Sequence, residues 1–357
     1  MTVEHNHRAE YQLPPSILQY LPIAGSKVVD ATQHGQSHYG RTARLTIQLP
    51  SGLFTSYFLK ILEGELGMIT CRGEYESLKS IYSVCAHAPA PLGWGSYLED
   101  NIDYSYLLVE FLAIQKQPAD AKDLAASLAE LHLKSQSPTG KFGFHVPTCH
   151  TRNVQAVDLW TDSWCELFSS HLSRIISHAK TAFKWPEFDH LGKLVLSKIV
   201  PALLLPLQTD GRSIKPCLVH GDCWDGNTAS GEDGRAFFFD VASFYAHNEY
   251  DLGNWRAPRH AVSDSAYTDA YKALIPVSEP VIISQVEDWN SRNLLYSLTW
   301  NICNALFVPH STQKPQVFKD MIVLCERVCP DDLDNLLSAW DKAKGIITDP
   351  PIFDRED

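Results

Sequence analysis

The 357-residue sequence predicts an α+β fold with a β-rich N-terminal lobe and a larger α-helical C-terminal lobe. Two observations support this fold class. Strand-forming residues concentrate in the first third of the chain, and strong helix formers with leucines at helical spacing fill most of the rest. We place the two lobes at residues 1–112 and 113–357, joined by a short connector near residues 110–117. A cleft between two lobes is a common position for a ligand.

The first lobe is expected to begin with three strands. The β-rich segments, separated by the turn-prone QHGQSHYG and PSG, are residues 27–32, 41–50 and 54–62. A helix is predicted over residues 71–86, because apolar residues recur there at i, i+3, i+4 and i+7: Leu78, Ile81, Tyr82 and Cys85. APAPLGW is expected to be a loop, and residues 104–112 an apolar strand.

The second lobe is expected to be helical over residues 118–210 and again over residues 265–345. Between these regions lie two short apolar segments, CLVHGD and AFFFDV, which we predict to be neighbouring strands. Each segment delivers an acidic residue at its end, Asp222 in the first and Asp240 in the second. Isolated acids belong on surfaces, so their position after buried segments needs a chemical reason.

Composition and charge narrow the function classes. The formal charge of −12 and the pI near 5.6 argue against a nucleic-acid partner, because that affinity depends on Lys and Arg. The N-terminus has no signal-peptide pattern, and no run of about 18 uncharged apolar residues predicts a membrane span. The nine cysteines are odd in number and widely spread, which favours reduced thiols and a cytoplasmic protein. The sequence leaves the oligomeric state open.

Two charged residues of the first lobe are candidates for phosphate binding. Lys60 lies inside the apolar strand SYFLKIL, where it either reaches solvent from an edge or faces a cleft and binds phosphate. Glu74, fourteen positions later on the predicted helix, is either a surface residue or the partner that holds Lys60 in place. Gly35 and Gly40 lie in the turn before this strand, and their backbone N–H groups are candidates to approach phosphates.

The second lobe supplies a set of residues suited to phosphoryl transfer. Asp222 can receive a proton from an attacking hydroxyl group, while Asn227 and Asp240 offer a neutral and a charged oxygen. Such oxygens, together with phosphate oxygens and waters, form the octahedral shell that Mg²⁺ prefers. Each residue alone is typical of a turn or a cap. Their joint order, with Lys60 ahead of them, favours transfer of a phosphoryl group from a nucleotide.

At these positions the sequence resembles the fructosamine kinase (ketosamine-3-kinase) family, a branch of the aminoglycoside- and choline-kinase-like fold. The resemblance rests on HGDCWDGN, FFFDVASFYAHNEYDL and FGFHVPTCH, with weaker likeness in LAELHL and GEYESLKSI. These strings fall between about residue 55 and residue 255, and the last hundred residues carry little that matches. HGDxxxxN alone is shared by many small-molecule kinases, whereas the other strings point to this branch.

The resemblance implies a bilobal protein-kinase-like fold that uses ATP and Mg²⁺. It implies that Lys60 holds the α- and β-phosphates, paired with Glu74, and that Asp222 is the catalytic base. Asn227 and Asp240 would bind the metal. The backbone of Glu110 would meet the adenine, and Trp224 would lie beside the substrate unless it is a core residue under the loop. The implied reaction phosphorylates the 3-hydroxyl of ketosamines, including glycated lysines on proteins, in deglycation.

Two departures from the family pattern bear on function. Val241 replaces the usual proline after the metal-binding Asp, which should leave Asp240 able to bind, and Cys223 replaces a leucine. The region after Asn254 diverges most, and it puts the acceptor in doubt. Two alternatives therefore stay open: a kinase of the same fold acting on another small hydroxyl or amino-sugar metabolite, and a nucleotide-binding pseudokinase. Intact Lys60 and Asp222 argue against the second.

Overall fold

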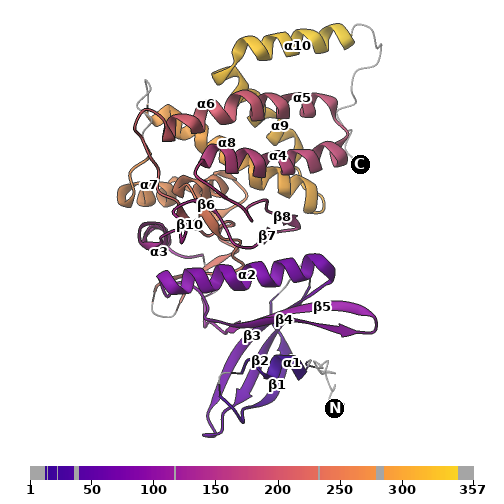
Figure 1. Cartoon of the computed structure of the whole chain (residues 1–357), viewed down its shortest axis with the longest axis vertical. Helices are drawn as coiled ribbons and strands as arrows, with labels where there is room; N and C mark the ends of the chain where they lie inside the picture. The colour runs from indigo at the N-terminus through magenta and orange to yellow at the C-terminus, as the bar shows by residue number, and fades with distance from the viewer. Residues whose placement is uncertain are drawn as a thin grey trace, which may run out of the picture. The chain divides into compact units, whose positions relative to one another are not determined.

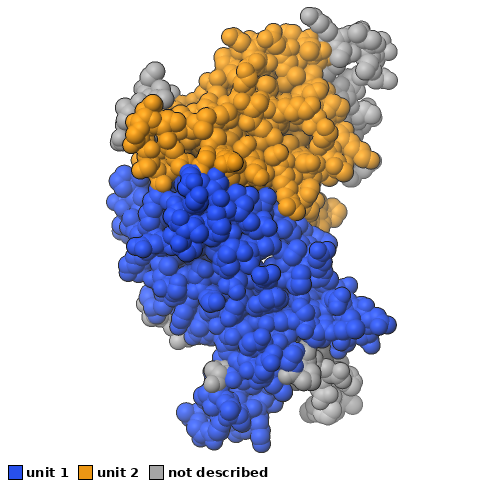
Figure 2. Space-filling view, in the orientation of Figure 1, with its two compact units in different colours: residues 1–162, 215–276 blue, residues 163–214, 277–357 orange. Residues whose placement is uncertain are grey.

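A computed structural model describes residues 13, 15–21, 23–35, 40–115, 118–231, 234–278 and 285–344 (Figure 1). The chain divides into two compact units, one formed by residues 1–162 and 215–276 and the other by residues 163–214 and 277–357 (Figure 2). We call them unit 1 and unit 2. The predicted lobe boundary at residue 112 lies inside unit 1 and stays a prediction. The predicted fold class, with an N-terminal sheet and a helical C-terminal part, is confirmed.

Unit 1 begins with the short helix α1 (Pro15–Leu18) and a five-stranded antiparallel sheet of order β1-β2-β3-β5-β4. Its strands are β1 (Lys27–Gln33), β2 (Gly40–Gln48), β3 (Phe54–Glu63), β4 (Pro91–Glu99) and β5 (Ile102–Glu110). One face of the sheet is a core in which buried residues alternate along each strand, as period-2 geometry requires: Ala43, Leu45 and Ile47 on β2, and Leu59 and Ile61 on β3. The expectation of a loop at APAPLGW was wrong in part, because β4 begins at Pro91 and pairs with β5.

The helix α2 (Gly64–Val84) contacts β3, β4 and β5 (Figure 1). It begins seven residues earlier than the sequence predicts, since two glycines concealed its first turn. At Gly67 an added Cβ would lie 2.8 Å from the backbone of Leu62, so glycine lets the helix pack closely on the end of β3. Leu78 and Ile81 are fully buried as expected, whereas Tyr82 is 46% exposed.

The rest of unit 1 joins helices to short strands. Its helices are α3 (Ala121–Lys134), the 3-10 helices η3 (Asn248–Arg256) and η4 (Ala261–Ser263), and α7 (Ser265–Leu274). A four-stranded sheet has the order β10-β13-β6-β9, with β10 (Cys217–Val219), β13 (Phe244–Ala246), β6 (Phe142–Gly143) and β9 (Trp160–Thr161). Two hairpins complete it, β7 (Cys149–His150) with β8 (Asn153–Val154) and β11 (Thr228–Ser230) with β12 (Ala236–Phe238). The sequence predicts helix across residues 118–210, so the short strands β6 to β9 were missed.

The two strands that lead to the acidic residues are not hydrogen-bonded neighbours. β10, which precedes Asp222, pairs with β13, while β12, which precedes Asp240, pairs with β11. The prediction of neighbouring strands was therefore wrong. Two- and three-residue pairs have too little periodicity to be assigned from sequence, so this pairing was hidden.

Unit 2 is helical in its described residues. Its elements are α4 (Trp164–Phe183), α5 (Pro186–Leu194), η1 (Val195–Ile199), α6 (Val200–Leu204), η2 (Leu205–Gln208), α8 (Gln285–Phe307), α9 (Gln313–Val328) and α10 (Pro330–Lys344). The continuous stretch Pro186–Gln208 is long and apolar enough to cross a membrane, with a mean hydropathy of 1.4. A core helix of a soluble protein has the same length and composition, and this stretch packs on α4 and α9. It therefore does not identify a membrane span, and the absence of one stays a prediction.

The hairpin β7–β8 carries a histidine with an unusual environment. His150 is 4% exposed, and neither ring nitrogen has a hydrogen-bond partner among the described residues. Burial lowers the pKa of His150 to about 4, because the surroundings disfavour the charged ring. The unfolded chain takes up this proton near pH 6.5, whereas the native chain does not until about pH 4. The native state therefore loses stability as pH falls through this window.

We expect the free energy of unfolding to fall by about 2 kcal/mol between pH 7 and pH 5 through His150 alone. The variant His150→Leu, which cannot take up a proton, should lack this component. Urea titrations of both proteins at the two pH values measure the difference. An equal loss of stability in wild type and variant would contradict the assignment.

Candidate active site

Lys60 occupies the middle of β3, between Thr42 on β2 and Leu107 on β5. Its side chain is 10% exposed, and Nζ donates to Glu74 Oε2 at 2.7 Å. Nζ also donates to Asp240 Oδ1. The expected pairing of Lys60 with Glu74 is therefore present, and Asp240 joins it from a distant part of the chain.

The three charges of this cluster shift one another's pKa values. Burial alone would lower the pKa of Lys60, but the carboxylates of Asp240 and Glu74 outweigh it and raise the pKa. Burial raises the pKa of Glu74 to about 7, opposed by Lys60 and reinforced by Asp240. Burial would also raise the pKa of Asp240, yet the ammonium of Lys60 holds it below its ordinary value. Lys60 therefore stays protonated and Asp240 stays ionised near neutral pH.

The hairpin β11–β12 brings Asn227 and Asp240 to the same place. Thr228 pairs with Phe238 in an antiparallel register, so the residues just before β11 and just after β12 lie at one end of the hairpin. The backbone N–H of Phe239 donates to the carbonyl oxygen of Asn227 at 3.0 Å, which extends the pairing by one step. Asp240 then adopts a φ of 52°, a left-handed conformation that is uncommon outside glycine.

The segment after β10 turns sharply to present Asp222. Gly221 has a φ of +86°, and an added Cβ would lie 2.0 Å from the carbonyl oxygen of Ala242. Only glycine fits there, because both the backbone conformation and the space exclude a side chain. The backbone N–H of Asp222 donates to His220 Nδ1 at 3.2 Å, so His220 supports the turn.

Asp251, on η3, stabilises the same turn by accepting hydrogen bonds from its backbone. It is fully buried, and its carboxylate accepts the backbone N–H groups of His220 at 2.7 Å and of Gly221 at 2.9 Å. His132 Nε2 lies 3.2 Å from Asp251 Oδ2, and His132 Nδ1 lies 2.6 Å from the hydroxyl oxygen of Tyr271. A buried carboxylate is stable in such a place because each oxygen has partners.

Asp222 receives one amide N–H on each carboxylate oxygen. Asn227 Nδ2 donates to Oδ2 at 3.1 Å, and Asn254 Nδ2 donates to Oδ1 at 3.1 Å. Burial raises the pKa of Asp222 to about 7, the nearby charge of Asp240 adds to this rise, and the hydrogen bonds from the two amides oppose it. A carboxylate with a pKa near neutrality accepts a proton more readily than a solvated aspartate.

Trp224 lies in the loop between Asp222 and Asn227 and is half-buried. Its ring stands 4.7 Å from the ring of His260. An added Cβ at Gly226 would lie 2.1 Å from the Trp224 ring, so glycine is needed to seat the indole. The structure thus places Trp224 beside the predicted base, and its role toward a substrate stays a prediction.

The remaining predicted residues lie in the five-stranded sheet and the turn before β2. Glu110 is the last residue of β5, and its side chain is exposed. Its backbone N–H donates to the carbonyl oxygen of Ala90 at 2.9 Å, and its Oε2 accepts from the backbone N–H of Ala90 at 3.1 Å. Gly35 has a φ of +76°, which suits a turn. An added Cβ at Gly40 would lie 2.4 Å from the carbonyl oxygen of Ile61, so this glycine is required by the sheet itself. The residues between them, 36–39, lie outside the described residues.

Sequence reasoning missed Asn254 as a site residue. It lies 32 positions from Asp222 in a 3-10 helix whose residues 249–255 are all buried, so no apolar periodicity distinguishes it. His260 was also missed, since a histidine in a loop carries no signal of its own. Among the described residues no cluster of three or more His, Cys, Asp or Glu side chains is suited to a metal ion. All nine cysteines are free thiols, as expected.

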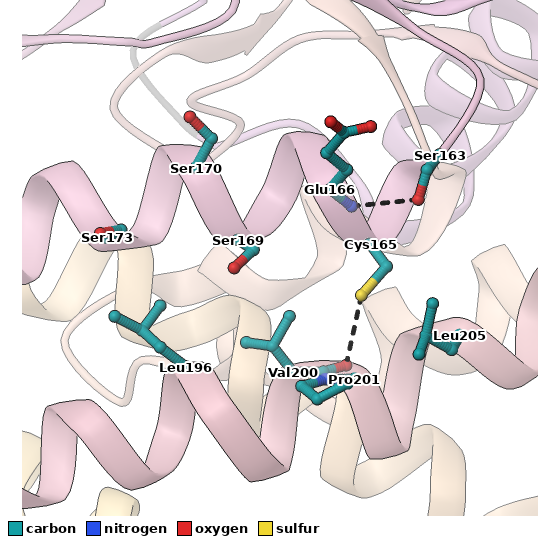
Figure 3. Close-up of a pocket in the computed structure, with 10 residues that line it drawn as sticks. All are labelled: Ser163, Cys165, Glu166, Ser169, Ser170, Ser173, Leu196, Val200, Pro201 and Leu205. Carbon is teal, nitrogen blue, oxygen red and sulfur yellow. Dashed lines mark hydrogen bonds between the residues drawn. The ribbon is translucent and has the colours of Figure 1, made fainter.

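A groove of about 440 Å³ in unit 2 is a separate feature (Figure 3). Ten residues from the segments 163–173 and 196–205 line it, and the Cys165 thiol donates to the carbonyl oxygen of Val200. None of the predicted site residues belongs to it. Serines and aliphatic side chains make up most of its lining, and Glu166 is the one charged residue among the lining residues, so the lining holds no cation for phosphates.

Two crystal structures share the fold of this chain. A protein from Thermobifida fusca YX-ER1 matches with a TM-score of 0.65 and 19% identity, over 87% of this chain and 98% of its own. A protein from Haemophilus somnus 129PT matches with a TM-score of 0.64 and 19% identity, over 84% and 92%. Both are proposed to be fructosamine-3-kinases. The chain therefore shares the fold of these two proteins.

The family model for fructosamine kinase matches residues 30–322, and the chain belongs to that family. A chloroplastic protein-ribulosamine 3-kinase of Oryza sativa subsp. indica is 30% identical over 205 residues, which are 57% of this chain and 56% of the rice protein. The ketosamine-3-kinase of Mus musculus is 27% identical over 281 residues, 71% of this chain and 84% of the mouse protein. The chain thus spans little more than half the length of the rice relative. The resemblance seen in the sequence motifs is confirmed.

The hydrogen bonds of Asp251 lead to a stability prediction. Asp251→Ala should lower the free energy of unfolding by about 2–5 kcal/mol, because two buried backbone N–H groups and His132 lose their acceptor. The matched control is Asp264→Ala, which removes the carboxylate that caps α7 through the N–H of Ala266. That cap is solvent-exposed, so its loss should lower the free energy of unfolding by only about 1 kcal/mol. Urea unfolding compares the two variants, and equal losses would show that the burial of Asp251 is irrelevant.

Proposed function

We propose that this chain is an ATP-dependent phosphotransferase with an alcohol group as acceptor. The observation that carries the proposal is the meeting, inside unit 1, of three groups with different charge behaviour. Lys60 is a buried ammonium, Asp240 is a carboxylate kept ionised by it, and Asp222 is a partly buried carboxyl group with a raised pKa. Phosphoryl transfer needs a cation for the phosphates, a charged metal ligand and a residue that takes the proton of the nucleophile.

In the reaction we propose, each residue has a separate task. The acceptor oxygen attacks the γ-phosphorus of ATP, the bond from this phosphorus to the bridging oxygen breaks, and ADP leaves with that electron pair. The hydroxyl proton passes to the Asp222 carboxylate. Lys60 binds the α- and β-phosphates as a point charge and limits the repulsion between phosphate oxygens. Glu74 keeps the lysine in this position.

The residues at the end of the β11–β12 hairpin fit a Mg²⁺ ion. The Asp240 side chain is 52% exposed, so an ion can reach it, and only its Oδ1 is taken by Lys60. Asn227 directs its Nδ2 at Asp222, which turns its Oδ1 away as a neutral oxygen ligand. We propose that these two side chains hold Mg²⁺, which supplies positive charge to the phosphate oxygens.

For the acceptor, we propose the 3-hydroxyl of a ketosamine, a sugar joined to an amine. Family membership supports this choice, and two relatives are named for ribulosamine and ketosamine substrates. The substrate would be a free glycated amine or a glycated lysine on a protein, and its repair would take place in the cytoplasm. We assign the contact with the sugar to Trp224, which is half-buried and two residues from Asp222.

A panel of acceptors tests this proposal. Purified protein, ATP and Mg²⁺ are incubated with fructosyl-lysine, ribulosyl-lysine, an aminoglycoside or choline, and the products are read by phosphorus NMR. We expect a phosphorylated ketosamine. Turnover of the aminoglycoside or of choline instead would refute the ketosamine acceptor but support the phosphotransferase activity. Nucleotide binding without turnover of any acceptor would favour the pseudokinase alternative.

The role of Asp222 has its own test. Asp222→Asn keeps the shape of the side chain but cannot accept a proton, so turnover should fall by about 100- to 10,000-fold. Binding of ATP with Mg²⁺, measured by calorimetry, should stay close to wild type. Asp162→Asn makes the same chemical change at a side chain that is 80% exposed, and it should leave turnover unchanged. Wild-type turnover in Asp222→Asn would refute the proton-acceptor role.

A further inference from the structure

The carboxylate of Asp222 is held on both of its oxygens. Asn227 Nδ2 donates to Oδ2, and it also donates to the backbone oxygen of Asp222 at 2.9 Å. Asn254 Nδ2 donates to Oδ1. A carboxylate held on one oxygen can still rotate about the bond to its Cβ, whereas two donors on different oxygens define the plane of the group. Each oxygen keeps a further lone pair, so the acceptor hydroxyl can still approach.

The orientation of the Asn254 amide follows from charge. If the amide were flipped, its carbonyl oxygen would face a carboxylate oxygen of Asp222, and two acceptors would repel. Asn254 is 2% exposed, and its Oδ1 has no hydrogen-bond partner among the described residues. A buried oxygen without a partner lowers stability. The amide is therefore poorly explained as a stabilising feature of the core, and its one directed contact is with Asp222.

The helix η3 positions this contact. Asp251 and Asn254 are three residues apart, and residues at i and i+3 of a 3-10 helix lie on the same face. From this face Asp251 holds the backbone N–H groups of His220 and Gly221, and Asn254 holds the side chain of Asp222. The backbone of His220 and Gly221 and the side chain of Asp222 are thus both oriented by residues of η3.

We propose that Asn254 is a positioning residue that fixes the plane of the Asp222 carboxylate for attack by the acceptor hydroxyl. The inference rests on the proposed phosphotransferase function and adds a residue to its site. Misplacement of a catalytic group lowers the rate of the chemical step far more than it weakens binding. Asn254 contacts neither the Lys60 cluster nor the predicted metal ligand Asp240 in any described interaction, so nucleotide binding should not depend on it.

The test is the variant Asn254→Leu, which removes the amide at nearly constant volume. We expect kcat to fall by about 10- to 100-fold, with KM for ATP and for the acceptor unchanged. The melting temperature should stay close to the wild-type value, because removal of an unpaired buried oxygen offsets the loss of the donor to Asp222 Oδ1. Asn254→Ala, which introduces no clash, should give the same separation of kcat from KM and serves if the leucine variant does not fold.

Two controls distinguish positioning from structure. Asn248→Leu removes an amide from the same helix, one that donates to the Tyr271 hydroxyl at 3.0 Å, and it should keep the wild-type kcat. In an Asp222→Asn background, Asn254→Leu should cause no further loss of the residual single-turnover rate, because both changes act through one group.

The outcomes separate this inference from the function on which it rests. Wild-type protein that transfers phosphate to no acceptor overturns both. Active wild type with a normal kcat in Asn254→Leu and Asn254→Ala overturns the inference alone. A parallel rise in KM or loss of melting temperature in both variants also overturns it, since that would be a structural effect.

Discussion

The interaction on which the site depends most is the contact of the buried Lys60 ammonium with two carboxylates. Its ammonium joins three segments: β3, the helix α2 through Glu74, and the end of the β11–β12 hairpin through Asp240, which is 180 positions away in sequence. A buried charge left without its partner costs about 3–5 kcal/mol, so these segments cannot separate freely. The sheet, the helix and the hairpin are therefore oriented toward one another by a single charged group. That group is also the cation we propose for the phosphates.

The two aspartates of the site, Asp240 and Asp222, have pKa values shifted in opposite directions. Asp240 has an ammonium beside it and stays ionised, as a ligand for a cation should. Asp222 accepts hydrogen bonds from two amides and lies near other carboxylates, and burial raises its pKa to about 7. Two side chains of the same type thus differ in proton affinity within one site, because their surroundings differ. Phosphoryl transfer needs both kinds, one carboxylate to hold positive charge and one to take up a proton.

The sequence revealed the parts of the site that local rules control. Lys60 stood out because lysine is a poor resident of an apolar strand, and Asp222 because an acid followed a buried segment. The pairing of β10 with β13, in place of β12, was hidden because strands of three residues carry no usable period. Asn254 was hidden for a different reason. Its contact with Asp222 spans 32 positions and depends on the turn of a 3-10 helix, which no spacing rule detects.

The helix η3 and the segment that follows it contribute different side chains to the surroundings of Asp222. Its buried residue Asp251 accepts the backbone N–H groups of the turn before Asp222, and in the chain that follows the ring of His260 lies against the ring of Trp224. In the same region Arg259 lies close enough to Asp222 for their charges to interact, while burial lowers the pKa of this guanidinium. The sequence motifs predict divergence from the family after Asn254, whereas the family model matches through this segment to residue 322. Changes in this segment can therefore alter the surroundings of Trp224, where we propose that the acceptor binds, without changing the contacts of Lys60 with Glu74 and Asp240.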